Sequence, residues 1–415
     1  MKKITVKANK NPIIRGKGVC DPHLRVIGDR MVLFCSHDAD KNSPSYRMEN
    51  WEVWSTRDFI TFTREKRIYP SQTFMGKSPF CWATDGIERN GKVYFYFSDG
   101  GEQTGVLVAS ALDGDYVDPL KKPLIPKGEY CNHAYDPAIF IEDDGTPYIL
   151  FGAPAWAYGE GEQYFIARLN EDMISLAESP KKIQLNHPAD DKVSLHKENG
   201  IYYLTYGSFY ATSENVYGPY TFRGNVGVST DHGSYEKWKG QWYHSFTVQD
   251  PTDHYRATGI CYVHYKKNGE MVCDQMIAEY GVGRYDGCWN RIEGEWFTAC
   301  DSIVKEENDV GGFSVAPLNG KGTLYFPHVS HTKGKRAILF SVKNVAHGSR
   351  MVVKTETGEV LADAEIPAQK FNDYRGIRPV VLPFSRKITE KELSITVEMY
   401  GDRNAFALDW FRFID

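Results

Sequence analysis

One strand–turn–strand unit recurs along the chain and constrains its fold more than any other feature of the sequence. In the copy at residues 136–151, Asp143-Asp144-Gly145 separates two apolar runs, and Asp136-Pro137 stands at its start. A turn signal of this kind between apolar runs predicts a β-hairpin. The other four copies lie at residues 21–34, 86–97, 194–206 and 234–246.

A second pair of strands, marked by a further strand-like segment, follows each of the five hairpins. These segments lie at residues 51–59, 105–110, 164–169, 209–213 and 259–265. Sets of four strands that recur every roughly 40–60 residues are typical of β-propeller blades. The sequence therefore predicts an all-β chain with a five-bladed β-propeller over residues 1–288. A β-sandwich is the alternative, but it would not repeat one turn-centred motif at so regular a phase.

The repeated unit stops near Trp289, and the rest of the chain has a different pattern. Short strands are predicted there at residues 322–326, 336–342, 351–354, 380–382, 392–398 and 406–411. A segment of this length made of short alternating strands is typical of a β-sandwich. We therefore expect a second, jelly-roll-like β-sandwich domain at residues 289–415.

Composition excludes several classes of function. The net charge is −5, and the Lys and Arg residues are dispersed, so a nucleic-acid partner is not expected. No run of roughly 18 apolar residues is present, so no membrane partner is expected either. No feature of the sequence indicates an oligomeric state. Aromatic residues make up 14% of the chain; most suit strands and core, and a smaller share suits a site that packs flat rings against sugars.

The start of the chain and its cysteines predict a location. Residues 1–7 include basic side chains but no apolar segment, which is unlike a signal peptide. The eight cysteines are scattered, without a CxxC pair, as expected for reduced thiols. We expect a cytoplasmic protein; an export signal absent from this sequence would instead give a secreted or periplasmic one.

Three aspartates fall where propeller strands converge. The first strand of each blade lines the central channel, so side chains at the starts of these strands meet at one end of it. Asp21, Asp136 and Asp191 occupy such places, and Asp21 and Asp136 each precede a proline, which favours an extended backbone. A single Asp-Pro pair often only starts a strand, but two at equivalent repeat positions favour a shared site. Clustered carboxylates suit glycoside hydrolysis, in which one activates water and another donates a proton.

The first two thirds of the chain, from residue 11 to about residue 288, resemble glycoside hydrolase family 43. The matching pieces are Asp21-Pro22-His23, Cys81-Trp82-Ala83-Thr84-Asp85, Tyr135-Asp136-Pro137, Asp143-Asp144-Gly145 and His232-Gly233-Ser234. This resemblance implies a five-bladed propeller that acts with inversion. It also implies that Asp21 is the general base and that Asp136 tunes the pKa of the general acid and orients it.

The general acid is where the sequence departs from this family. The family has a glutamate followed by Gly-Pro, whereas Asp191-Lys192-Val193 stands here. Lys192 would lower the pKa of Asp191 if the two side chains met, which is unfavourable for a proton donor. Either Asp191 serves with the backbone shifted forward, or Glu160 or Glu162 of the nearby Gly-rich loop supplies the proton, or the chain has no functional acid. Glu198, at a hairpin tip, is expected to be solvated.

The resemblance also implies residues that bind substrate. His232 would face the central cavity and hold a water or a cation such as calcium, acting through water because hard cations prefer oxygen ligands. Arg256 would reach the acid or the sugar, and Trp82 would stack on the sugar. His37 and His133, near strand ends, are candidates for hydroxyl contacts. A core or surface role is the alternative for each of these side chains.

The C-terminal domain resembles carbohydrate-binding module family 6. The matching pieces are Arg291-Ile292-Glu293-Gly294-Glu295 and Leu408-Asp409-Trp410-Phe411-Arg412-Phe413. The resemblance implies a structural calcium held by Glu293, Glu295 and Asp409, whose carboxylate oxygens suit that ion. Ordinary solvated or salt-bridged acids are the alternative. Tyr374 is a candidate sugar platform. The alternative is a domain that packs on the propeller and shapes its cleft.

The sequence thus predicts an inverting, exo-acting glycoside hydrolase that needs no cofactor for its chemistry. Its expected partner is an oligosaccharide or polysaccharide from plants, which it would cleave as an α-L-arabinofuranosidase or β-xylosidase. Two alternatives remain. One is a β-galactosidase or galactanase specificity on the same scaffold, and the other is a non-hydrolytic propeller that binds carbohydrate.

Overall fold

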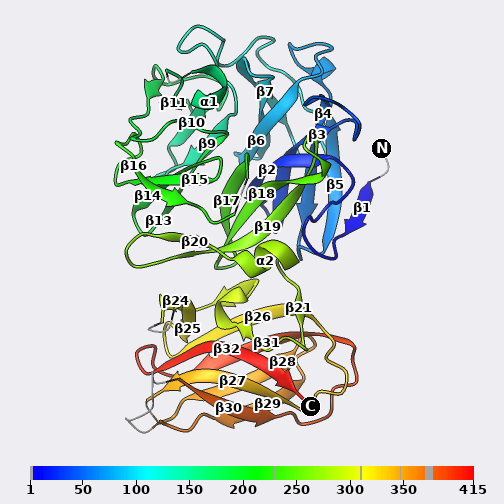
Figure 1. Ribbon diagram of the computed structural model, residues 1–415, viewed down its shortest axis with the longest axis vertical. Helices are drawn as coiled ribbons and strands as arrows, with labels where there is room; N and C mark the ends of the chain where they lie inside the picture. Colours follow the sequence, from blue (N-terminus) through cyan, green and yellow to red (C-terminus); the bar gives the residue numbers. More distant parts are fainter. Residues whose placement is uncertain (1–2, 160, 229, 309–310, 346, 370–376) are drawn as a thin grey trace. The chain divides into compact units, whose positions relative to one another are not determined.

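The computed structural model describes residues 3–159, 161–228, 230–308, 311–345, 347–369 and 377–415 (Figure 1). The described chain is nearly all β. Its helices are α1 (Ala155–Tyr158), α2 (Gln275–Tyr280) and the 3-10 turns η1 (Pro70–Gln72) and η2 (Gly294–Trp296). Within these residues, none of the helices has the length and apolar character needed to span a membrane.

The chain divides into two compact units. The first comprises Met1–Glu236, Trp242–His264 and Gly269–Gly281, and the second comprises Lys237–Gln241, Tyr265–Asn268 and Val282–Asp415. Each unit has its own set of sheets.

The first unit contains five sheets, each built from consecutive strands of the chain. The first sheet has the order β1-β5-β4-β3-β2, with β1 (Ile4–Lys7), β2 (Val19–Ile27), β3 (Arg30–Asp38), β4 (Met48–Thr56) and β5 (Thr61–Ile68). The second contains β6 (Cys81–Arg89), β7 (Lys92–Asp99) and β8 (Gln103–Ala109). The third contains β9 (Ala138–Ile141), β10 (Pro147–Gly152), β11 (Tyr164–Arg168) and β12 (Lys181–Lys182). The fourth contains β13 (Val193–Glu198), β14 (Ile201–Tyr206), β15 (Phe209–Ser213) and β16 (Thr221–Asn225), and the fifth contains β17 (Gly233–Trp238), β18 (Gln241–Thr252), β19 (Tyr255–Tyr265) and β20 (Met271–Cys273).

All five predicted strand–turn–strand copies are present as neighbouring strands: β2–β3, β6–β7, β9–β10, β13–β14 and β17–β18. In the β6–β7 turn, Asn90 and Gly91 have φ values of 52° and 70°. In the β13–β14 turn, Asn199 and Gly200 have φ values of 51° and 80°. Two successive residues with positive φ give a tight turn whose twist matches that of the flanking strands, and Asn-Gly tolerates this conformation best.

The first strands of the sheets lie against one another, and in Figure 1 β2, β6, β9 and β17 run through the middle of the unit. The amide of Ile139 in β9 donates to Asp85 of β6 at 2.6 Å. The amide of Leu24 in β2 donates to the Ser234 hydroxyl of β17 at 2.7 Å. These contacts between sheets hold the starts of β2, β9 and β17 in fixed positions.

Apolar clusters fill the space between adjacent sheets. Phe34 and Trp51 of the first sheet pack with Phe95 and Phe97 of the second. Trp51 is fully buried, and its indole N–H donates to the carbonyl of Trp82 at 2.8 Å. Similar clusters join the second sheet to the third and the third to the fourth.

The second unit contains two six-stranded sheets. One has the order β21-β26-β31-β28-β29 with β23 on β26, from β21 (Tyr285–Asp286), β23 (Ala299–Asp301), β26 (Lys321–Ser330), β28 (Arg350–Thr355), β29 (Val360–Glu365) and β31 (Glu392–Tyr400). The other has the order β24-β25-β32-β27-β30 with β22 on β32, from β22 (Ile292–Glu293), β24 (Ile303–Glu307), β25 (Phe313–Pro317), β27 (Ala337–Asn344), β30 (Ile377–Pro383) and β32 (Phe406–Ile414). Phe326 of β26 and Phe411 of β32 are both buried, with ring centroids 4.8 Å apart, so the sheets face each other across a shared core.

All six strands predicted for the second unit are present, but others were missed, including β24, β25 and β29. The sequence Ile303-Val304-Lys305-Glu306-Glu307 of β24 ends in three charged residues, which are depleted in strands. β24 pairs with β25 in the structure, so the strand forms through this pairing in spite of its weak propensity.

We predict that Trp51→Ala destabilises the first unit by about 3–5 kcal/mol, because it leaves a cavity between two sheets and removes the indole hydrogen bond. Urea denaturation followed by circular dichroism measures the change. Trp156→Ala is the matched control, since Trp156 is 71% exposed and its loss opens no cavity. Equal effects of the two substitutions would show that the Trp51 cluster is not a structural core.

Candidate active site

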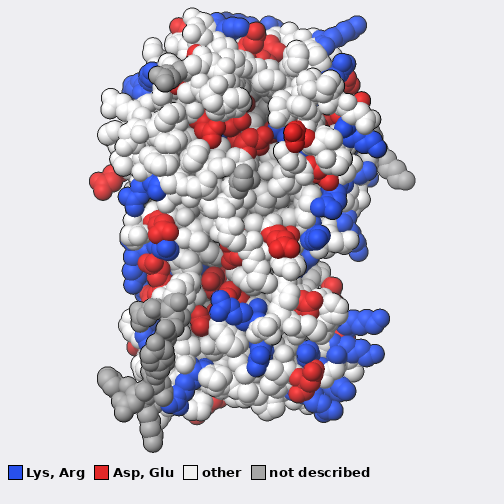
Figure 2. All heavy atoms as spheres, in the orientation of Figure 1, with Lys and Arg blue, Asp and Glu red and all other residues white. Residues whose placement is uncertain are grey.

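A pocket of about 330 Å³ opens in the first unit. It is lined by Asp21, Tyr46, Met48, Trp82, Ala83, Tyr135, Asp136, Pro154, Trp156, Ala157, Tyr158, Asp191, Asp231, His232 and Arg256. Figure 2 shows acidic side chains gathered on the face of this unit. The pocket therefore combines aromatic walls with a concentration of carboxylates.

The predicted aspartates come from the starts of the first strands. Asp21 lies in β2, Asp136 lies two residues before β9, and Asp191 lies two residues before β13. His232 directly precedes β17. These four residues are far apart in sequence, but all of them line the pocket, so the starts of β2, β9, β13 and β17 lie close together there.

Asp21 and Asp136 share an unusual backbone. Their φ values are 48° and 55°, in the left-handed region, which costs about 1–3 kcal/mol for a residue other than glycine. The Asp21 amide donates to the Thr247 hydroxyl at 3.0 Å, and the Asp136 amide donates to the Ser98 hydroxyl at 2.9 Å. Each hydroxyl lies on the second strand of another sheet, so the same kind of hydrogen bond fixes the backbone of both aspartates.

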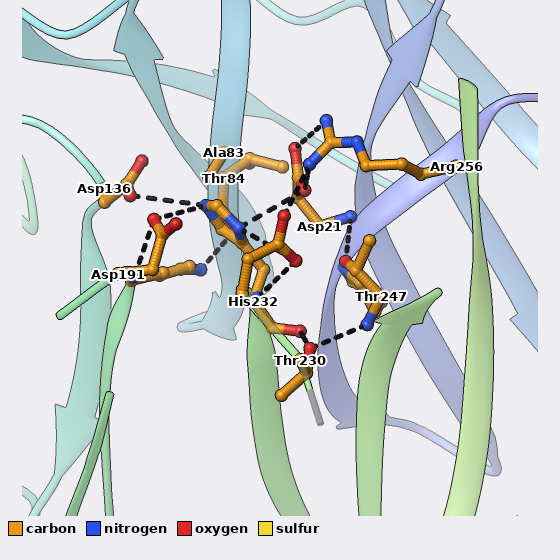
Figure 3. A network of polar contacts seen from close by, with 12 residues as sticks. Asp21, Ala83, Thr84, Asp136, Asp191, Thr230, His232, Thr247 and Arg256 are labelled. Carbon is orange, nitrogen blue, oxygen red and sulfur yellow. Dashed lines mark hydrogen bonds and ion pairs between the residues drawn. The ribbon is translucent and has the colours of Figure 1, made fainter. Parts of the chain in front are cut away.

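Arg256 of β19 binds three carboxylates at once. Figure 3 shows its guanidinium beside Asp21. Its Nη1 and Nη2 donate to the two oxygens of Asp21 at 2.7 and 3.2 Å. Its Nε and Nη2 donate to Asp38 at 3.1 Å each, and its Nη1 lies 3.1 Å from Asp231. Asp21, Asp38 and Arg256 are buried, so these charge-assisted bonds are scarcely screened by solvent.

His232 stands among four carboxylates (Figure 3). Its Nε2 lies 3.3 Å from Asp136 and 3.6 Å from Asp191, and its Nδ1 lies 3.5 Å from both Asp21 and Asp231. Burial alone would lower the pKa of His232, but the carboxylates of Asp21, Asp191 and Asp231 raise it well above the usual value. The imidazole therefore carries a positive charge at neutral pH.

Asp191 has the electrostatics of a proton donor. Burial, with additional repulsion from Asp231, Asp136 and Asp190, raises the pKa of Asp191 to about 8, although His232 opposes the shift. Its side chain is still 19% exposed, so it reaches the space where a substrate would lie. A carboxyl that keeps its proton at pH 7, in one pocket with an arginine-bound carboxylate, can act as an acid opposite a base.

The Lys192 side chain binds groups other than Asp191, so the condition for its expected effect on the pKa of Asp191 is not met. The Lys192 ammonium donates to His23 Nδ1 at 2.8 Å and to the Thr84 carbonyl at 2.7 Å, and it is not among the groups that shift the pKa of Asp191. Successive side chains of an extended segment point to opposite sides, so Lys192 points away when Asp191 faces the pocket. Burial lowers the pKa of Lys192 to about 8, although Asp85 and Asp136 oppose this change.

Some of the predicted substrate-binding residues lie in the pocket and others do not. Trp82, His232 and Arg256 line the pocket, whereas His37 and His133 do not. His37 precedes Asp38 in β3, and burial lowers its pKa, which the charges of Glu52 and Arg67 also affect. His133 stacks on Tyr158 with ring centroids 3.8 Å apart, so it supports a pocket residue from behind.

The described alternative acids, Glu162 and Glu198, do not line the pocket either. Glu162 is buried outside its lining. Glu198, expected to be solvated, is partly buried and accepts a hydrogen bond from Trp242 Nε1 at 3.0 Å. Glu160 lies outside the described residues. Of the described candidates, only Asp191 faces the site.

Several residues of the site were missed by sequence reasoning. Asp38 and Asp231 both bind Arg256, and Tyr46 places its ring 4.7 Å from that guanidinium. Asp231 adjoins His232 in sequence, which is a signal that could have been used. Asp38 ends β3, the strand that pairs with the Asp21 strand, but no motif marks it.

The candidate calcium residues of the second unit have ordinary partners. Glu293 forms an ion pair with Arg291, and Asp409 accepts a hydrogen bond from Asn308 at 2.9 Å. Glu293, Glu295 and Asp409 do not form a group of three donors within 4.8 Å, among the residues that the structure describes. Tyr374, the candidate sugar platform, lies outside that part of the chain.

Comparisons with known proteins agree with this arrangement. A sequence model described as Glycosyl hydrolases family 43 matches residues 9–275. A xylosidase/arabinosidase of Bacteroides ovatus is 26% identical over 64% of this chain and 98% of its own length. A β-D-galactofuranosidase of Aspergillus niger is 27% identical over 66% of this chain and 87% of its own. The crystal structure of a family 43 arabinoxylan arabinofuranohydrolase from Bacillus subtilis, in complex with cellotetraose, has a TM-score of 0.55 at 21% identity and covers 98% of each chain, which shows a shared fold.

We predict that Arg256→Met destabilises the first unit by about 3–5 kcal/mol, because it leaves Asp21, Asp38 and Asp231 close together without their shared cation. Chemical denaturation of the purified variant measures the loss. Arg47→Met is the control, since Arg47 pairs with Glu49 on the surface, and the unfolding midpoint should hardly move. A stable Arg256→Met protein would mean that the three carboxylates do not depend on Arg256.

Proposed function

The chain belongs to glycosyl hydrolase family 43, and on this premise we propose that it is an inverting, exo-acting glycosidase for arabinofuranosyl or xylosyl units. One observation carries the proposal: a carboxyl group with a raised pKa, Asp191, shares a pocket with the arginine-bound carboxylate Asp21. The names of the relatives support the choice of sugar.

We assign the chemical roles as follows. Asp21 accepts a proton from a water molecule as the oxygen of that water forms a bond with the anomeric carbon. Asp191 donates a proton to the glycosidic oxygen as the bond between that oxygen and the anomeric carbon breaks. Asp136 and the charged His232 orient Asp191. Inversion requires a separation of roughly 6.5–9.5 Å between the acid and the base, which leaves room for the attacking water.

We also propose that the five sheets of the first unit are the blades of a β-propeller. The contacts between β2, β6, β9 and β17 support a central channel lined by first strands. For the second unit we propose a β-sandwich of the type found in carbohydrate-binding module family 6. Its two facing sheets support that architecture, and carbohydrate binding by it is part of the proposal.

A galactose-directed specificity is the second candidate, and the name of the Aspergillus niger relative favours it. A purely carbohydrate-binding propeller is less well supported, because Asp191 lines the pocket and burial raises its pKa to about 8. A cation bound directly in the pocket fits the side chains poorly, since the protonated His232 already lies among Asp21, Asp136, Asp191 and Asp231 with its own charge. Structural calcium elsewhere remains a proposal.

An aromatic side chain in the wall of the pocket supports a binding place for the leaving group, the part of the oligosaccharide that is released. Trp156 of α1 lines the pocket although it is 71% exposed, and its side chain hydrogen-bonds the Asp190 carboxylate. An exposed tryptophan held in this way can stack on a sugar ring that lies outside the deepest part of the pocket. Trp82 is less exposed and contacts Tyr135 within the pocket, which suits the sugar being cleaved.

The acid–base assignment predicts distinct kinetic behaviour for two substrates. Asp21→Asn should lower kcat/KM by about 10²–10⁴-fold on both nitrophenyl glycosides and natural oligosaccharides, because water activation is lost. Asp191→Ala should lose activity on oligosaccharides but retain much of it on nitrophenyl glycosides, whose leaving group needs little protonation. The sugar is identified by comparing substrates of three kinds. These are the nitrophenyl arabinofuranoside, xyloside and galactoside, and the oligosaccharides of arabinan, xylan and galactan.

The control for this series is Glu162→Gln, which should leave both activities unchanged. A loss of oligosaccharide cleavage in Glu162→Gln, with none in Asp191→Ala, would transfer the acid role to the loop glutamate. A wild-type protein inactive on all these substrates would overturn the hydrolase proposal.

The pKa of Asp191 predicts the alkaline limb of the pH profile. Asp191 is active when protonated, so kcat/KM on oligosaccharides should fall as pH rises through about 8. On nitrophenyl glycosides, whose leaving group needs little protonation, the same limb should be much weaker. A limb that is equally steep on both substrate types would belong to another group.

Trp156→Ala should raise KM for oligosaccharides several-fold and leave KM for nitrophenyl glycosides nearly unchanged. Trp82→Ala, the comparison variant, should impair both, since it contacts the sugar common to both substrates. Steady-state kinetics on the two substrate types test the assignment. Equal effects of Trp156→Ala on both types would place its ring against the cleaved sugar.

A further inference from the structure

Three different metal-binding side chains, none of which lines the pocket, meet in the second unit. Asp286, Cys288 and His331 each offer one ligand atom, and these atoms all lie within 4.8 Å of one another. His331 Nδ1 is 2.9 Å from Asp286 Oδ2. We propose that these three side chains bind a zinc(II) ion.

The donor set points to zinc over the hard cations. A thiolate and an imidazole suit zinc, whereas calcium and magnesium select oxygen ligands. Around a tetrahedral zinc with bonds of about 2.0–2.3 Å, the ligand atoms lie about 3.3–3.8 Å apart. The Asp286–His331 contact therefore needs to open by only a few tenths of an ångström. Three protein ligands leave one position for water.

The backbone holds the ligands in place without the ion. β21 pairs in parallel with β26, with Asp286 opposite Ser330, so Cys288 and His331 follow two neighbouring strand ends. The Gly287 amide donates to the Ser330 carbonyl at 2.8 Å, and a Cβ at Gly287 would lie 2.9 Å from that oxygen. The Cys288 amide donates to Asp286 Oδ1 at 2.8 Å. Glycine is therefore required between two of the ligands.

The site is open to solvent. Cys288 is the one exposed cysteine of the eight, and the His331 and Asp286 side chains are 68% and 28% exposed. An exposed thiol can react with oxidants and alkylating reagents, and a bond to zinc would protect it. Binding releases the thiol proton to solvent and joins residues 286–288 to His331, 45 residues away from Asp286.

Cobalt(II) is the probe that tests this proposal, because a cobalt–thiolate bond gives a near-ultraviolet charge-transfer band. Metal-free protein, prepared with a chelator, is titrated with cobalt(II) and then with zinc(II). We expect one equivalent of cobalt to give the band and zinc to remove it. Zinc should also slow alkylation of Cys288 and raise the Tm of the second unit.

The variants separate this site from other sources of binding. Cys288→Ser should abolish the band, and His331→Ala should weaken cobalt binding by about tenfold or more, since one of three protein ligands is lost. Cys300→Ser, which alters a partly buried thiol of the same unit, should keep the band. His232→Asn should also keep it, because the carboxylate and histidine groups of the pocket contain no cysteine.

Two results would overturn the proposal: a wild-type protein that gives no thiolate band, or a band that survives in Cys288→Ser. Because Cys288 is exposed, its substitution should not disturb folding, and circular dichroism verifies this for each variant. Glycosidase activity is not part of this test, so the zinc site and the proposed function stand or fall separately.

Discussion

The contact of Arg256 with Asp21, Asp38 and Asp231 is the interaction on which the active site depends. Three carboxylates from different strands could not lie so close together without a cation among them, since their mutual repulsion in a buried setting would separate them. The planar guanidinium meets this need because it presents several N–H donors in fixed directions. It thereby fixes the oxygens of the proposed base with respect to the strands that carry the remaining site residues.

The distribution of charge around this contact explains why neighbouring aspartates behave differently. Arg256 is committed to three carboxylates, and the single charge of His232 is shared among four. Asp191 shares the charge of His232 with three other carboxylates, so the effect of burial prevails and Asp191 keeps its proton to a higher pH than an ordinary carboxyl. Lys192, its neighbour in sequence, is bonded to His23 and Thr84 instead. A shorter acid beside a lysine is thus compatible with proton donation.

Much of this arrangement could be predicted because short segments of the sequence indicate it. Turn residues such as Asn90-Gly91 mark the hairpins, and comparison of the copies aligned Asp21 with Asp136. The direction of a side chain could not be predicted in the same way. Whether Lys192 meets Asp191, or His37 faces the pocket, depends on which side of an extended segment points inward. Asp38 was missed because its partner Arg256 lies 218 residues away and no motif joins them. β24 was missed because its partner strand, not its composition, stabilises it.

The left-handed backbone at Asp21 and Asp136 affects how these positions can be altered. Asparagine adopts this conformation almost as readily as aspartate, whereas alanine does so at a larger conformational cost. A change from aspartate to asparagine therefore removes the charge while keeping the main chain and its hydrogen bond to Thr247 or Ser98. A change to alanine removes the charge and strains the chain as well. Inactive proteins intended for trapping intact oligosaccharides in crystals are thus best made with asparagine, since their pocket keeps the shape that binds the substrate.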